Sequence, residues 1–140
     1  MYQSDWILRQ IEMMGVMFRR MLEALREHRP DEVLDLSDEA IGELMGTDVA
    51  LLDSLTGEGL VTLLGIGSEP DVYRMHMLAE VLLARAEAHE QLGRTEGADA
   101  ERGRARALLR AARSEIDDEQ QLARVDELLG WLESDGAKPA

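Results

Sequence analysis

The sequence contains no cysteine and a single lysine, and each shortage narrows what the chain can do. Without cysteine, disulfides, thiol nucleophiles and thiolate metal sites are all excluded, and a reducing compartment suits the chain. The single lysine is Lys138, near the carboxyl end. The body of the chain therefore lacks the lysine that a phosphate-binding P-loop or a Schiff-base enzyme needs.

Basic residues and long apolar runs are also scarce. Lys and Arg number 15 against 29 Asp and Glu, which gives a net charge of −14. Charge of this sign repels nucleic acid phosphates and anionic lipid, so we expect neither nucleic acid nor membrane as a partner. No run approaches the length of a membrane span, and the start MYQSDW lacks the basic and apolar regions of a signal peptide. We predict a cytoplasmic protein.

The motifs of common catalytic sites are missing as well. The serines lack a GxSxG setting, the glycine pairs GEG and GIGS do not complete GxGxxG, and no HExxH occurs. We therefore predict no enzyme activity, no catalytic residues, no metal ligands and no cofactor.

The catalytic alternative depends mainly on the three histidines. None of His28, His76 and His89 has a glutamate three residues before it, so the Glu-x-x-His pairs of di-iron helical bundles are absent. The alternative is a small-molecule or metal-dependent enzyme whose site lies between helices and uses His76, His89 and Glu80.

Apolar residues make up 45% of the 140 residues and recur mostly with helical spacing. We predict an all-α fold of about five or six helices, packed as antiparallel hairpins in one domain over residues 1–134, with a disordered tail over 135–140. Segments 48–54 and 57–64 are expected to be short helices over the core, with a strand over 60–64 as the weaker option. Predicted helix boundaries are Pro30, Gly46 and Gly93, with caps at Thr56, Thr95, and Asp117 or Asp118.

The first predicted helix, to about residue 27, is apolar on more than one side. One stripe has the spacing 4, 3, 4, 3, 4 and contains Ile7, Ile11, Met14, Phe18, Met21 and Leu25. Leu8 and Leu22 widen it, and Gly15 allows close approach of another helix. We predict a homodimer that buries this excess through Ile11, Met14, Phe18 and Met21.

The stretch LLARAEAHEQLGRTEGADAERGRARALL, residues 82–109, resembles one tetratricopeptide repeat. Small residues stand where the two helices of such a pair cross, at Ala86, Ala98 and Ala105, and Gly93 stands at the turn. The resemblance implies a stack of helical hairpins with a groove for a peptide or protein partner.

The opening MYQSDWILRQIE and the helical hairpin after it resemble an uncharacterised family of small bacterial helical proteins that begin in this way. This resemblance covers most of the chain and implies a helical fold. It implies no activity and no catalytic residues.

An arginine row stands out in this acidic sequence. Arg102, Arg106, Arg110 and Arg113 fall on one face of a predicted helix, and guanidinium groups in a row pair well with carboxylates or phosphates. They are the candidate partner-binding residues, for example for an acidic peptide. Pairing with acidic residues of the chain itself or of a second subunit is the favoured alternative.

Together these features predict a non-enzymatic protein–protein interaction or scaffolding domain. The expected partner is a protein, a peptide or a second copy of the chain.

Overall fold

The computed structural model describes residues 2–46, 49–65 and 69–134, and every regular element in these ranges is an α-helix. There are seven: α1 (Tyr2–Arg26), α2 (Pro30–Met45), α3 (Val49–Asp53), α4 (Gly57–Leu64), α5 (Glu69–Gln91), α6 (Thr95–Arg113) and α7 (Glu119–Ser134). The all-helical prediction is confirmed, and the count exceeds the expected five or six. Both segments expected to be short helices are helices, α3 and α4. The strand over 60–64 is wrong, since those residues belong to α4. The predicted tail, 135–140, lies outside the described residues.

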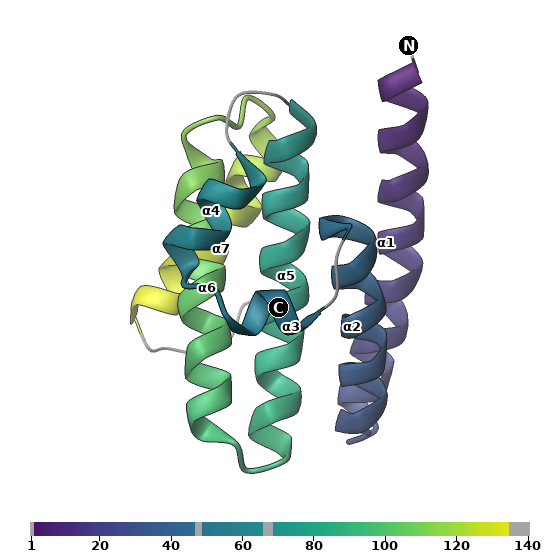
Figure 1. The fold of residues 1–140 in the computed structure, drawn as a ribbon, viewed down its shortest axis with the longest axis vertical. Helices are drawn as coiled ribbons and strands as arrows, with labels where there is room; N and C mark the ends of the chain where they lie inside the picture. The colour runs from purple at the N-terminus through teal and green to yellow at the C-terminus, as the bar shows by residue number, and fades with distance from the viewer. Residues whose placement is uncertain (1, 47–48, 66–68, 135–140) are drawn as a thin grey trace.

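Helix α5 is the element around which the others are arranged (Figure 1). It contacts α1 and α2 on one side and α4 and α6 on the other, while α7 packs against α6. The N-terminal half of α1 rises beyond the end of α2, at the right of the view. This half of α1 therefore extends past the helix that covers the rest of it.

One continuous hydrophobic core contains residues from all seven helices. Leu52 of α3 and Leu60 of α4 are fully buried, so both short helices cover the core as predicted. Among the helices described, none carries an apolar stretch long enough to cross a bilayer.

The face of α1 that packs into the core differs from the predicted stripe. Its buried side chains are spaced 4, 3, 4 and 3, and they are Gln10, Met14, Met17, Met21 and Ala24. Two residues of the predicted stripe, Met14 and Met21, belong to this side, whereas Ile11, Phe18 and Leu25 are only half-buried. The side chain of Ile7, the sixth member, lies outside the part that the structure describes. Spacing alone fits two overlapping stripes here because more than half of the helix circumference is apolar. The side with the flexible methionines and the small Ala24 is the one that packs into the core, because these side chains allow α2 and α5 to approach α1 closely.

The first two helices end at residues with a left-handed backbone conformation. His28 adopts a left-handed conformation with φ 57°, which turns the chain out of α1, and Pro30 then stands at the start of α2. Gly46 ends α2 with φ 69°, and its N–H donates to the Gly42 carbonyl at 2.9 Å.

Helix caps are predicted correctly at two positions and wrongly at one. The Thr56 hydroxyl accepts from the Gly59 N–H at 3.0 Å, and the Asp118 carboxylate accepts from the Gln121 N–H at 2.7 Å. Thr95 is not a cap, because it is the first residue of α6 and the cap position is Arg94, which makes no capping hydrogen bond through its side chain.

The close approach of α4 to α6 predicts opposite effects for two glycine substitutions. An added Cβ at Gly57 would lie 2.6 Å from the Ala107 Cβ and 3.3 Å from the Gly103 carbonyl, and neither atom can rotate away. We expect Gly57→Ala to lower the free energy of unfolding by roughly 1–3 kcal/mol, as overpacking does. A Cβ added at Gly103 would meet nothing within 4 Å, so Gly103→Ala should raise the free energy of unfolding by about 0.5–1 kcal/mol. Urea denaturation followed by circular dichroism measures both, and equal effects would contradict the packing described.

Candidate functional site

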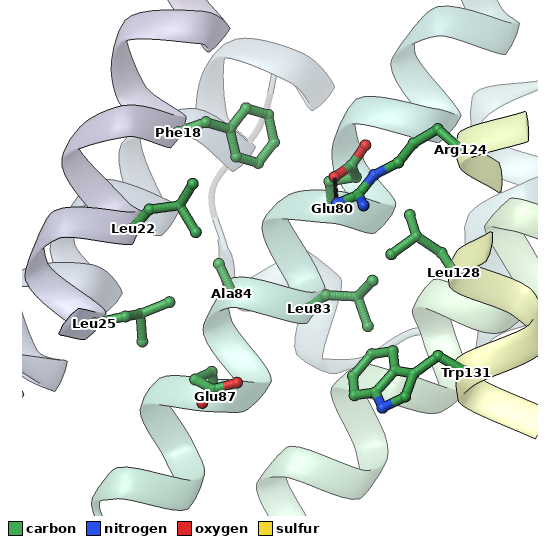
Figure 2. A pocket seen from close by; sticks show the side chains of 10 residues that line it. All are labelled: Phe18, Leu22, Leu25, Glu80, Leu83, Ala84, Glu87, Arg124, Leu128 and Trp131. Atoms are coloured by element: carbon green, nitrogen blue, oxygen red, sulfur yellow. Dashed lines mark hydrogen bonds and ion pairs between the residues drawn. The ribbon is translucent and has the colours of Figure 1, made fainter. Parts of the chain in front are cut away.

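An apolar groove of about 240 Å³ opens between α1, α5 and α7 (Figure 2). We refer to it as the α1–α5–α7 groove. Its lining residues are Phe18, Leu22, Leu25, Glu80, Leu83, Ala84, Glu87, Arg124, Leu128 and Trp131.

Helical periodicity brings these side chains to one place. Each helix contributes residues three or four positions apart, which share one face of a helix. In Figure 2 the α1 side chains Phe18, Leu22 and Leu25 form one wall. Leu128 and Trp131 of α7 stand opposite them, and the α5 residues lie between the two walls, so three helices distant in sequence build the groove.

A fixed charged cluster lies at one end of the groove. Arg124 donates to one oxygen of Glu80 at 3.0 Å, and His76 Nε2 lies 2.7 Å from the other oxygen. The Gln121 amide nitrogen lies 3.0 Å from His76 Nδ1, so both ring nitrogens have partners. Burial alone would raise the pKa of Glu80, but the hydrogen bonds with His76 and Arg124 outweigh it and hold the pKa below its ordinary value. Glu80 is therefore a carboxylate at neutral pH that holds α5 against α7.

Apart from Glu87, the rest of the groove is apolar, and it is partly open to water. Leu22 lies on its wall with 54% of its surface exposed. Small Ala84 leaves room between the larger side chains of the two walls (Figure 2). Exposed aliphatic surface of this kind, gathered in a concave region, is typical of a binding surface for a protein segment.

The predicted arginine row finds partners inside the chain at all four positions. Arg102 pairs with Glu90 at 2.6 Å, Arg106 donates to the Leu132 carbonyl at 3.1 Å, Arg110 pairs with Glu133 at 2.8 Å, and Arg113 pairs with Asp126 at 2.5 Å. The favoured interpretation, internal pairing, describes what the row does in this structure. Binding of an outside acidic partner by the row stays a prediction.

The four predicted dimer residues lie in two different environments. Met14 and Met21 are buried in the chain's own core, with 2% and 0% of their surface exposed. Ile11 and Phe18 are half-buried beside them. In this structure Ile11 and Phe18 are accessible to a second copy, whereas the two methionines already pack in the chain's own core. The dimer interface itself stays a prediction.

The predicted histidine site is not assembled. His76 and His89 are thirteen residues apart on α5, which places them about 20 Å apart along the helix axis. The ring of His89 packs against Gly97, and its pKa is lowered by burial and by nearby Arg85 and Arg94. Across the described ranges, no group of three or more His, Cys, Asp or Glu side chains is arranged to hold a metal ion.

A network of buried charged side chains around Arg85 was not predicted from the sequence. Arg85 is 8% exposed and donates to the Ser37 hydroxyl at 3.0 Å and to Asp38 at 2.6 Å. Its Nε lies 3.5 Å from Glu101, which is 3% exposed and accepts from Arg104 at 3.0 Å. Burial raises the pKa of Glu101 in spite of both arginines. The network fixes α2, α5 and α6 against one another. The one signal in the sequence was an arginine inside the apolar stretch around residue 85.

Comparison with protein-family models, with curated proteins and with solved structures finds no match for this chain. The resemblances to tetratricopeptide repeats and to the family that begins MYQSDWILRQIE therefore stay predictions.

The lowered pKa of Glu80 predicts a pH-dependent contribution to stability. A carboxyl group whose folded pKa is lowered stabilises the fold above its unfolded value of 4.5 and loses this effect as pH falls through the folded pKa. We expect Glu80→Gln to cost about 1–2 kcal/mol at pH 7. The difference from the wild type should vanish in acid, and urea denaturation across this pH range measures it. Exposed Glu39→Gln is the control, and a Glu80→Gln difference that persists at the lowest pH would refute the assignment.

Proposed function

We propose that this protein is a non-enzymatic interaction or scaffolding domain that binds an apolar protein segment in the α1–α5–α7 groove. The observation that carries the proposal is the partial exposure of apolar side chains from three helices around one concave surface: Leu22 of α1, Leu83 of α5 and Trp131 of α7. Removing such surface from water on binding contributes about 25 cal/mol per Å².

The size and chemistry of the groove favour a protein segment over a metabolite. Its volume, about 240 Å³, is below the range of roughly 300–1,000 Å³ typical of small-molecule sites. Glu80 and Arg124 are hydrogen-bonded to each other, so these polar groups are already engaged and do not converge on a ligand. An apolar side-chain cluster on a partner helix fits this combination better than a polar small molecule.

The arrangement that we propose is a tetratricopeptide-like set of antiparallel helical hairpins. Support comes from pairs that face each other across the α5–α6 turn: His89 lies 3.4 Å from the position of a Cβ on Gly97, and Arg85 faces Glu101. The partner is then a protein or peptide, because a net charge of −14 disfavours nucleic acid. The proposal includes the cytoplasmic location expected from composition.

The groove is a better candidate for this role than the arginine row of α6. An acidic peptide at the row would first have to displace acceptors that the four arginines already have within the chain. The apolar walls of the groove have no comparable competitor, since water alone covers the exposed part of Leu22 in the isolated chain.

Site-specific photo-crosslinking in the native cell tests the proposal. A photoreactive p-benzoylphenylalanine in place of Leu22 stands at the groove wall, and the same residue in place of Leu63 on α4 is the matched control, since these leucines are 54% and 51% exposed. We expect a defined crosslinked protein product from position 22 and none from position 63. A chain that gives no product specific to position 22 has no protein partner in the groove, and the proposed function fails.

A further inference from the structure

Helix α1 carries a second apolar stripe that its own chain leaves partly uncovered. Its spacing is 3, 4, 3, 4 and 3, the pattern of a coiled-coil seam, and its members are Leu8, Ile11, Gly15, Phe18, Leu22 and Leu25. We call it the outer stripe. Leu8 is 58% and Leu22 54% exposed, and a Cβ added at Gly15 would meet nothing within 4 Å. The stripe is thus shaped to receive another helix, with its smallest residue in the middle.

Charged residues follow the outer stripe at intervals of seven. They are Asp5, Glu12, Arg19 and Arg26, and all four are exposed. Along this flank the order is acid, acid, base, base. Flanking charges set the orientation and register of paired helices, and this order complements itself only when a second copy runs in the opposite direction.

We propose that the outer stripe binds the outer stripe of a second copy of the chain, with the two α1 helices antiparallel across a twofold axis. This inference rests on the proposed function and names the occupant of the groove. In the register that matches both stripe and charges, three layers form, each occurring twice by symmetry: Leu8 with the partner's Leu25, Ile11 with the partner's Leu22, and Gly15 with the partner's Phe18.

The same register pairs every flanking charge with its opposite. In an antiparallel coiled coil, each flanking residue faces a flanking residue of the partner. These charge pairs are shifted along the helix by two residues relative to the apolar layers. Glu12 then faces the partner's Arg19, and Asp5 faces the partner's Arg26. A parallel arrangement would instead set Gly15 against Gly15 and bring the flanking charges toward the positions of Met14 and Met21, which are buried in the chain's own core.

The groove receives the end of α1 that lacks cover. Three residues belong to both the outer stripe and the groove wall: Phe18, Leu22 and Leu25. The antiparallel register therefore brings the partner's Leu8 and Ile11 to this wall, near α5 and α7. The N-terminal half of α1, which extends past α2 in Figure 1, gains its missing neighbour in this way.

Charge reversal on the flank tests the pairing in solution. We expect the wild type to sediment at twice the chain mass. Glu12→Arg and Arg19→Glu should each weaken self-association by about tenfold or more, because each change turns two attractive contacts of the symmetric dimer into repulsive ones. An equimolar mixture of the two variants should form a heterodimer, since every reversed charge then meets its opposite. Sedimentation equilibrium and native mass spectrometry measure these outcomes.

The matched control is Arg20→Glu, an adjacent exposed arginine on the opposite side of α1, which should leave dimerisation unchanged. A monomeric wild type, charge reversals without effect, or a mixture without heterodimer would overturn the proposal. A monomer that still crosslinks a different protein at position 22 would refute the second copy as occupant while leaving the interaction function intact. Loss of any crosslink at position 22 would refute both.

Discussion

The structure depends on one constraint: α1 is apolar on two sides, and its own chain fully covers only one of them. The side of α1 that carries Met14 and Met21 is buried against α2 and α5, whereas Leu8 and Leu22 remain more than half exposed. An exposed apolar stripe of this kind on a helix is typical of a contact surface, and we propose that a second copy of the chain covers it. The exposed wall of the groove and the proposed dimer both depend on this partly uncovered side of α1.

The groove exists because α1 and α7 lie on opposite sides of α5 and leave a concave space between their side chains (Figure 2). The contact of Glu80 with Arg124 fixes the α7 wall of the groove relative to α5, and the buried Arg85–Glu101 contact fixes α5 relative to α6. A rigid apolar site loses little conformational entropy when a helix binds.

Local signals in the sequence were sufficient for the helices but not for the site. Pro30, Gly46 and Thr56 act through backbone stereochemistry within a few residues, and these boundaries were predicted correctly. Thr95 was misassigned because the chain enters α6 one residue earlier than its hydroxyl could cap. The choice between two overlapping stripes on α1 depends on which helices pack there. The groove requires α7 to lie opposite α1, more than a hundred residues away in sequence, which no local pattern encodes.

Distances between spin labels on paired chains test the antiparallel arrangement most directly. The chain has no cysteine, so Arg9→Cys, Val16→Cys or Glu23→Cys each introduces one label at an exposed position of α1. Pulsed electron–electron double resonance should give the shortest distance between the two labels of a dimer at position 16, which lies near the proposed twofold axis. At positions 9 and 23 the two labels should lie farther apart by roughly 10 Å, because the helical rise moves them away from that axis in opposite directions. Equal distances at all three positions, or no coupling between subunits, would contradict the account.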